Sequence, residues 1–296
     1  RNALAWGARH DWNFVDLQIY PKTEKALNVS PNDLQFIKPV GDTASTDIKM
    51  ARTIPNTFKE NLQIYAKPKI VSLNNGKMFL TYVDDATDRT EENRFILMYS
   101  IYDGTNWSNP QPIFDDGTAD FEPTIYPDGT GGVYVVWQNA NKEFDENVTL
   151  EQMSANMDLY YTHWDGSRFI DTTAVTTNNN KYEMSQRIVS DGNNISIVWQ
   201  ENSENSSLTV VGENSIFRKQ CISGIWQQVE TMAQNLSTIN SVDTSYIDGD
   251  NFVVFSTQAD NSEVNSNSIK FEIFVVGGTG NIKLSNGETS DYSVNF

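Results

Sequence analysis

The chain has 296 residues, of which 38% are hydrophobic and 11% are aromatic, enough apolar material for a folded core. Lysine and arginine number 21 against 39 acidic residues, and the net charge of −18 repels nucleic-acid phosphates and anionic membrane surfaces. No apolar run approaches the roughly 18 residues that cross a bilayer. The single cysteine and two histidines, Cys221, His10 and His163, exclude an intrachain disulfide and most imidazole or thiolate metal sites.

Residues 1–63 show no clear internal repeat, although 12–20 and 33–40 have strand-like patterns. We expect them to form an N-terminal segment or a degenerate copy of the unit that follows. The chain begins with Arg1 and not with methionine, which predicts a processed protein or a part of a longer polypeptide.

From residue 64 onward one pattern recurs, namely a strand, a turn with glycine and a second strand that closes on an aromatic residue. The closing aromatic residues, spaced 55, 62 and 56 residues apart, are Tyr82, Trp137, Trp199 and Phe255. A second hairpin follows each first one, most clearly at 99–107 and 161–169, where Asp-Gly supplies the turn.

Two hairpins per repeat make four strands per repeat, and radial repetition of four-stranded antiparallel sheets is a β-propeller. We therefore predict an all-β fold with about four to five blades, complete here or part of a larger propeller. The four clear blades span about 64–116, 119–176, 182–233 and 240–290.

The links between the second and third strands are long, at 84–92, 139–157 and 201–213. They leave the same edge of their sheets, so we expect them to decorate one face and to meet a partner there. Thr149 and Gln152 have the spacing of a capping box, which predicts one or two turns of helix.

These hairpins resemble the blades of extracellular β-propeller proteins of Gram-positive bacteria. They are similar, more distantly, to sialidase-type propellers, whose Asp-box is Ser-x-Asp-x-Gly-x-x-Trp; here Ser100 and Trp107 keep their places, but the aspartate is Asp103, one place later. The resemblance implies an extracellular or cell-surface location. A sialidase also needs three converging arginines, and of the repeat arginines only Arg187 lies on a predicted innermost strand.

The aromatic residues that recur in each repeat have two interpretations. Tyr82, Trp137, Trp199 and Phe255 are expected to form the core between blades, with a sugar-stacking platform as the alternative. The same pair of interpretations applies to the aromatics of the second hairpins, which are Trp107, Trp164, Phe169 and Trp226.

Ligand chemistry is expected where equivalent positions differ between repeats. The residues that open the innermost strands are Lys67, Glu122, Ser185 and Asp243. We predict a ligand site at the mouth of the central channel formed by Glu122, Glu183, Arg187 and Asp243, with a solvated channel rim as the alternative. Glu122 and Asp243 are the candidate carboxylate pair if the chain is a glycoside hydrolase, which requires one acid and one base or nucleophile.

Two acidic clusters raise the question of a calcium site, because Ca²⁺ takes several oxygen ligands. They are Asp84, Asp85 and Asp88, and Asp115, Asp116 and Asp120. Neither has EF-hand spacing, so solvated loops are the competing interpretation, and no other cofactor is indicated.

The sequence favours a non-catalytic extracellular propeller that binds a protein or a carbohydrate through the loops of one face. The alternative is a sialidase-like glycoside hydrolase of the propeller class. The first hypothesis rests on the scaffold character of every strong motif, the second on the carboxylate pair Glu122 and Asp243.

Overall fold

The computed structural model describes residues 14–19, 56–177, 180–202, 214–258 and 271–277. The chain divides into two compact units, Arg1–Ile64 and Tyr65–Phe296. In the first unit β1 (Phe14–Ile19) pairs with β2 (Asn56–Gln63) in an antiparallel arrangement. The strand expected over 12–20 is therefore present, whereas 33–40 lies outside the described residues.

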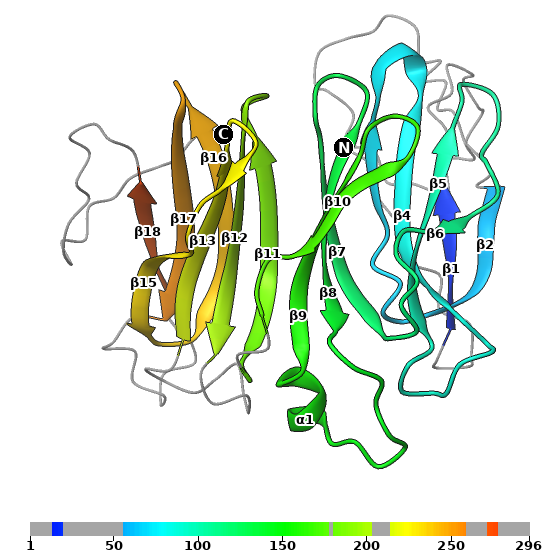
Figure 1. Cartoon of the computed structure of the whole chain (residues 1–296), viewed down its shortest axis with the longest axis horizontal. Helices are drawn as coiled ribbons and strands as arrows, with labels where there is room; N and C mark the ends of the chain where they lie inside the picture. The colour runs from blue at the N-terminus through cyan, green and yellow to red at the C-terminus, as the bar shows by residue number, and fades with distance from the viewer. Residues whose placement is uncertain (1–13, 20–55, 178–179, 203–213, 259–270, 278–296) are drawn as a thin grey trace, which may run out of the picture. The chain divides into compact units, whose positions relative to one another are not determined.

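The second unit consists of four antiparallel sheets that follow one another along the chain (Figure 1). The first contains β3 (Lys69–Ser72), β4 (Met78–Asp85), β5 (Phe95–Tyr102) and β6 (Gln111–Pro112); the second contains β7 (Asp120–Pro127), β8 (Val133–Ala140), β9 (Met157–Trp164) and β10 (Phe169–Ala174). The third contains β11 (Tyr182–Ser190), β12 (Asn194–Asn202), β13 (Asn214–Ile222), β14 (Ile225–Trp226) and β15 (Glu230–Leu236); the fourth contains β16 (Ile239–Ile247), β17 (Asp250–Gln258) and β18 (Phe271–Gly277).

The first strand of each sheet is an edge strand that also contacts the neighbouring sheets. Strand β3 contacts β7, β7 contacts β11, and β11 contacts β16, so the first strands are neighbours although each belongs to a different sheet. Sequential antiparallel sheets whose first strands meet are the arrangement of a β-propeller. The predicted fold class is confirmed, and the four sheets are hereafter called blades 1 to 4.

Three of the recurring aromatic residues, Trp137, Trp199 and Phe255, form the core between the blades, as predicted, and Tyr82 is buried too. Trp137 packs with Phe79 and Leu97 of blade 1, and Trp199 packs with Leu159 of blade 2. Phe255 packs with residues of blade 3 in the same way. The exposed fractions of Tyr82, Trp137, Trp199 and Phe255 are 0%, 0%, 1% and 2%. A side chain so deeply buried has no free ring face for a sugar, which excludes the stacking platform.

The aromatic residues of the second hairpins also pack inside the protein. Trp164 is buried and Phe169 packs beside it, while Trp226 packs against the core between blades 2 and 3. Trp107 is half-buried against the ring of Tyr102.

The aspartates of the Asp-Gly turns in the second hairpins of blades 1 and 2 have a local structural role. The Asp103 carboxylate accepts hydrogen bonds from the backbone N–H groups of Thr105 and Asn106, at 2.7 and 2.8 Å. Asp165 does the same for Ser167 and Arg168. These hydrogen bonds close the turn. The motif recurs because each hairpin needs such a turn, and its recurrence does not indicate a catalytic site.

The long links between second and third strands leave one end of the sheets, which we call the link end. Each first strand begins at this end because it is antiparallel to the second strand. Helix α1 (Leu150–Ser154) lies in the link of blade 2, below β8 and β9 in Figure 1. Thr149 and Gln152 form the expected capping box, so this short helix is confirmed. No helix among the described residues has the length and apolar character to span a membrane.

Candidate functional site

Residues on or just before three first strands share an unusual backbone conformation near the link end. Lys67, Glu122 and Ser185 have φ values of 42°, 46° and 56°, a left-handed conformation in which the Cβ atom of any residue except glycine is crowded. In β7 and β11 the strand pairing shifts at this point, so the left-handed residue forms a β-bulge opposite Trp137 or Trp199. Strained residues of this kind cost about 1 kcal/mol or more and concentrate at functional sites.

The strand register corrects one of the predicted equivalences. Asp243 pairs with Val254, the residue before Phe255, and in the other blades the residues with this pairing are Lys69, Thr124 and Arg187. Asp243 is therefore the equivalent of Arg187 and not of Glu122. Blade 4 has its bulge nearer the link end, between Ile239 and Ser241, and this moves its register by two residues.

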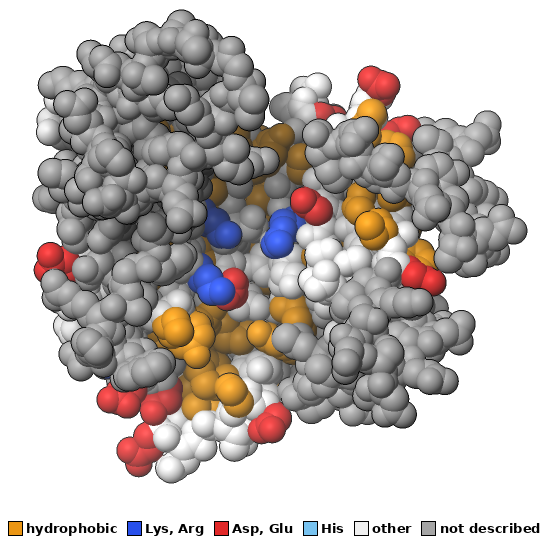
Figure 2. All heavy atoms as spheres, turned by 180° about the vertical axis from the view of Figure 1, so that it is seen from behind, with side chains coloured by type: hydrophobic (Ala, Val, Ile, Leu, Met, Phe, Trp, Pro, Cys, Tyr) orange, Lys and Arg blue, Asp and Glu red, His pale blue; other side chains and the backbone are white. Residues whose placement is uncertain are grey.

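The left-handed residues and this paired row bring charged side chains onto the first strands or just before them. The Lys67 ammonium lies 3.4 Å from the Glu122 carboxylate, and both side chains are 46% exposed. Partial desolvation lowers the pKa of Lys69, and the positive charge of Arg187 lowers it further. Figure 2 shows basic side chains gathered near the middle of the described surface, with acidic side chains beside them. We call Lys67, Lys69, Glu122 and Arg187 the charged cluster.

Neighbouring blades hold Glu122 in place from both sides. Its backbone carbonyl accepts a hydrogen bond from the Gln186 amide of blade 3, and its side chain pairs with Lys67 of blade 1. The reciprocal bond runs from the Gln138 amide of blade 2 to the Glu183 carbonyl of blade 3. The charged cluster is thus built on a part of the scaffold where hydrogen bonds join neighbouring blades.

Of the four predicted ligand-binding residues, three are exposed on first strands and one is buried. Glu122 is on β7, Arg187 is on β11, and Asp243 is on β16, with β11 lying between the other two strands. Glu183 is fully buried and occupies the place in blade 3 that Asp120 occupies in blade 2. The bulge at Ser185 breaks the alternation of the strand, so Glu183 does not share the outward face of Ser185.

Tyr65, which the sequence analysis did not single out, adds an exposed aromatic ring just before Lys67. It is 51% exposed and meets the rings of Phe95 and Phe121 edge-on, at centroid distances of 5.8 and 6.2 Å. Phe121 directly precedes Glu122, so an exposed ring and charged side chains lie in the same region of blades 1 and 2. Two residues before Glu122 and Ser185 stand Asp120 and Glu183, so the ring of Tyr65 is not part of the repeat, and the repeat pattern did not reveal it.

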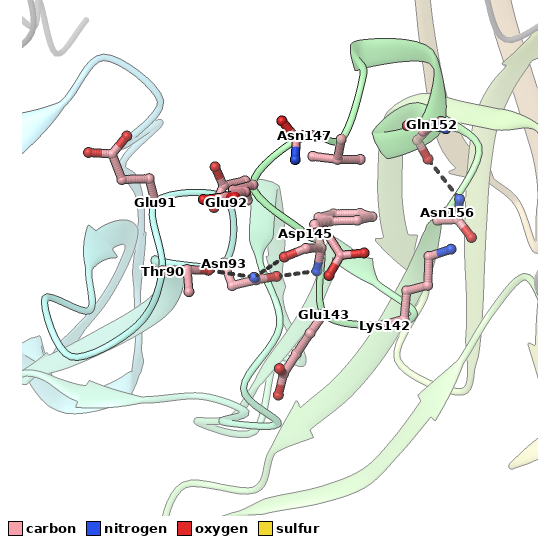
Figure 3. A pocket seen from close by; sticks show the side chains of 13 residues that line it. Thr90, Glu91, Glu92, Asn93, Lys142, Glu143, Asp145, Asn147, Gln152 and Asn156 are labelled. Carbon is pink, nitrogen blue, oxygen red and sulfur yellow. Dashed lines mark hydrogen bonds between the residues drawn. The ribbon is translucent and has the colours of Figure 1, made fainter.

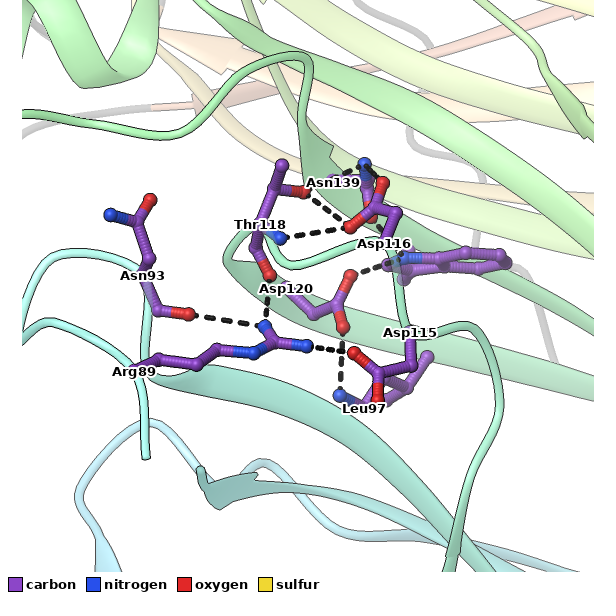
Figure 4. A network of polar contacts seen from close by, with 9 residues as sticks. Arg89, Asn93, Leu97, Asp115, Asp116, Thr118, Asp120 and Asn139 are labelled. Carbon is purple, nitrogen blue, oxygen red and sulfur yellow. Dashed lines mark hydrogen bonds and ion pairs between the residues drawn. The ribbon is translucent and has the colours of Figure 1, made fainter. Parts of the chain in front are cut away.

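The acidic cluster that leads into β7, which is Asp115, Asp116 and Asp120, belongs to the scaffold (Figure 4). Arg89 pairs with Asp115 and donates to the Thr118 carbonyl at 2.6 Å, while Asp116 accepts from the Thr118 N–H at 2.9 Å. Asp120 is buried and accepts from the Trp137 indole and the Leu97 N–H, each at 2.8 Å. Burial raises its pKa well above the ordinary value.

The proposed calcium ligands are also dispersed. Asp84 is buried, Asp85 pairs with Arg94, and Asp88 is exposed. Within the described residues no three histidine, cysteine or acidic side chains lie together in a way that suits a metal ion.

The described arginines do not converge as a sialidase requires. Four of them form ion pairs with carboxylates away from the first strands, as Arg89 with Asp115, Arg94 with Asp85, Arg168 with Asp165 and Arg218 with Glu230. Arg187 alone among the described arginines lies on a first strand.

The link end also carries a cleft of about 1190 Å³ between the links of blades 1 and 2 (Figure 3). Its walls are rich in acidic side chains, including Glu91, Glu92, Glu143 and Asp145, with Lys142 among them. Asn93 ties the two links together, since its side chain donates to the Phe144 carbonyl and accepts from the Phe144 N–H, both at 2.8 Å. The cleft is therefore shaped by ordered loops.

A second cleft, of about 510 Å³, lies between blades 2 and 3 at the opposite end of the sheets. Its walls include Tyr134, Tyr161, Trp226 and His163. The His163 ring nitrogen Nε2 lies 2.9 Å from the Asp128 carboxylate, which also accepts three backbone N–H bonds of its own turn. Asp128 thus has a turn-forming role, and the cleft joins the aromatic core of the two blades.

Comparisons with known proteins yield fold resemblances only. No family model and no curated protein matches the chain. Among solved structures, it is similar to an α-L-arabinanase of Penicillium chrysogenum complexed with arabinobiose, at 10% identity and a TM-score of 0.45 over 73% of this chain. It is also similar to a polysaccharide lyase of family 25, an ulvan lyase, at 10% identity and a TM-score of 0.47 over 73% of this chain.

A thermostable family-43 glycoside hydrolase is similar at 14% identity and a TM-score of 0.41 over 67% of this chain. The chain spans 63% of the length of the arabinanase, 56% of the lyase and 66% of the hydrolase. At these levels the likenesses carry no information on the activity of this chain.

Proposed function

We propose that this chain is a carbohydrate-binding propeller whose ligand contacts the first strands of the blades at the link end. The observation that carries the proposal is the charged cluster. Lys67, Glu122 and Ser185 share a strained backbone position, yet their side chains differ in every blade, whereas the aromatic core behind them repeats. When core residues repeat between blades and surface residues do not, the variable surface is typical of a binding site carried by a common fold.

A carbohydrate suits this surface because of its combination of groups. Sugars offer hydroxyl groups to charged side chains and C–H faces to an aromatic ring. The region has both, in Glu122 and Lys67 and in the exposed ring of Tyr65. Because polymeric glycans lie mostly outside the cell, the proposal includes the extracellular or cell-surface location expected from the sequence and resemblance.

Binding to a polysaccharide array tests this proposal. We expect the full chain to bind at least one polysaccharide, and we expect Glu122→Gln and Tyr65→Ala each to weaken that binding at least tenfold. Asp103→Asn is the matched control, because Asp103 closes a turn away from the link end and asparagine keeps that role. Absence of binding to every polysaccharide, or equal loss in the control, contradicts the proposal.

A second candidate function is glycoside hydrolysis by Glu122 and Asp243. The specific observation in its favour is that both carboxylates are exposed on first strands, β7 and β16. Hydrolysis requires an acid on one side of the glycosidic bond and a base or nucleophile on the other. We expect Glu122→Gln and Asp243→Asn each to lower turnover at least a hundredfold if this function holds; a wild-type chain that cleaves no glycan it binds would exclude it.

A further inference from the structure

The scarcity of positive charge makes the charged cluster informative about the ligand. The chain carries 21 basic residues against 39 acidic ones. In such a chain most arginines are expected to be neutralised by neighbouring carboxylates, and four of the five described arginines are. Arg187 is the exception within the described residues, since its guanidinium donates only to the backbone carbonyls of Ser185 and Gln186, at 3.4 and 2.9 Å.

The four residues of the charged cluster carry more positive than negative charge. Lys67, Lys69 and Arg187 contribute three cations, and Glu122 contributes one anion, which pairs with Lys67. Desolvation is the largest cause that lowers the pKa of Lys69; the like charges of Arg187 and Lys67 lower it further, whereas Glu122 acts in the opposite sense. Like charges on side chains of neighbouring strands are unfavourable in the free protein, and an anion that binds to them relieves the repulsion.

We infer that the ligand of this site is an acidic sugar whose carboxylate is bound by Lys67, Lys69 and Arg187. The inference rests on the proposed function and names its substrate class. A guanidinium binds a carboxylate through two parallel hydrogen bonds, and charge-assisted bonds of this kind are about twice as strong as neutral ones. The net charge of −18 disfavours long polyanions, so we expect a short acidic oligosaccharide to bind better than a long one.

The experiment compares matched pairs of acidic and neutral glycans by isothermal titration calorimetry with the full chain. The probes are oligosaccharides of polygalacturonate, alginate and hyaluronan, each beside its carboxyl-reduced form. Reduction removes the charge and keeps the sugar ring. We expect at least one acidic probe to bind ten or more times more tightly than its reduced form, with an advantage that shrinks as salt is raised.

Variants assign the effect to the cluster. We expect Arg187→Gln to weaken binding of the acidic probe at least tenfold and to leave binding of the reduced form within twofold. Lys69→Gln is expected to act in the same direction. Arg168→Gln is the control, because Arg168 lies on a turn at the opposite end of the sheets and its side chain is 78% exposed. Circular dichroism and thermal unfolding confirm that each variant is folded.

The outcomes separate this inference from the proposed function. Equal affinity for acidic and reduced probes, or no effect of Arg187→Gln on a folded variant, overturns the inference and leaves carbohydrate binding standing. Binding only to dextran sulfate, added as a sulfate probe, overturns the assignment to a carboxylate. Binding to no probe and to no polysaccharide of the array overturns both.

Discussion

Buried and strained residues in this propeller have effects that their identities alone do not reveal. Asp120 and Glu183 occupy equivalent buried places, yet in the sequence both look like surface carboxylates. Glu183 was predicted to contact a ligand because it is charged, but the bulge at Ser185 places the Glu183 side chain in the interior. A bulge is set by one left-handed residue, and no residue type in the segment requires it, so periodicity could not reveal it.

Asp120 should make stability depend on pH in a defined direction. Burial raises its pKa above 3.8, so the folded chain holds the proton to higher pH than the unfolded chain. The contribution of Asp120 to the free energy of unfolding is therefore largest below the unfolded pKa and falls as pH rises toward the folded pKa. In Asp120→Asn the side-chain amide N–H faces one of the two donors, Trp137 or Leu97, and cannot accept its hydrogen bond. We therefore expect the variant to lower the free energy of unfolding by about 1–3 kcal/mol near pH 4, and by less at pH 8.

Urea unfolding of both proteins between pH 4 and 8 measures this difference. Asp103→Asn is the control, and its pH dependence is expected to have the opposite sign. Backbone hydrogen bonds lower the pKa of Asp103, so the contribution of Asp103 to the free energy of unfolding is lost as pH falls. A difference between wild type and Asp120→Asn that grows with pH would contradict the assignment.

At Ser185 the stabilities of the valine and glycine variants should rank in the reverse order from those at an ordinary strand position. At φ 56° a β-branched side chain is crowded, so we expect Ser185→Val to be less stable than Ser185→Gly by about 1–2 kcal/mol. At the exposed Ser245 of β16, valine suits the strand and glycine weakens it, so the order should invert. Chemical denaturation of the four variants checks both orders, and the same order at both positions would refute the role of the backbone.

At the scale of elements, the regular parts were predictable and the irregular parts were not. Spaced aromatics and Asp-Gly turns indicated the hairpins because turn chemistry and core packing are local and repeat. The capping box indicated α1 for the same reason. The predicted alignment of β16 with the other first strands was wrong by two residues. The position of its bulge depends on packing against β17 and not on a turn motif.

The α1 cap gives an element-scale prediction. The Thr149 hydroxyl accepts from the Gln152 N–H at 3.2 Å, and the Gln152 side chain accepts from the Thr149 N–H at 2.9 Å. We expect Thr149→Ala to destabilise this helix by about 1 kcal/mol and to speed hydrogen exchange of the Gln152 amide. Ser154→Ala in the last turn keeps the cap and should leave that exchange rate unchanged; equal acceleration in both variants would count against the cap.

At the scale of the whole second unit, stability depends on aromatic residues that lie between blades. Trp199 fills the space between blades 2 and 3 and is 1% exposed. We expect Trp199→Ala to lower the free energy of unfolding by about 3–5 kcal/mol, because it leaves a large cavity. Trp107→Ala, at a half-buried position beside Tyr102, should cost less than half as much in the same denaturation assay. Similar losses would argue against a core shared between blades.

The two ends of the sheets differ in a way that matters for handling the protein. The tight turns at Gly104, Gly166 and Gly192 lie at the end opposite the links, and an added Cβ atom at Gly104 or Gly192 would meet nothing within 4 Å. A biotin or fluorophore coupled to a cysteine introduced beside Gly104 or Gly192 would therefore tether the molecule with its charged cluster facing solution. Surface-immobilised assays oriented in this way should retain full glycan capacity, whereas coupling through the links of blades 1 and 2 should obstruct access.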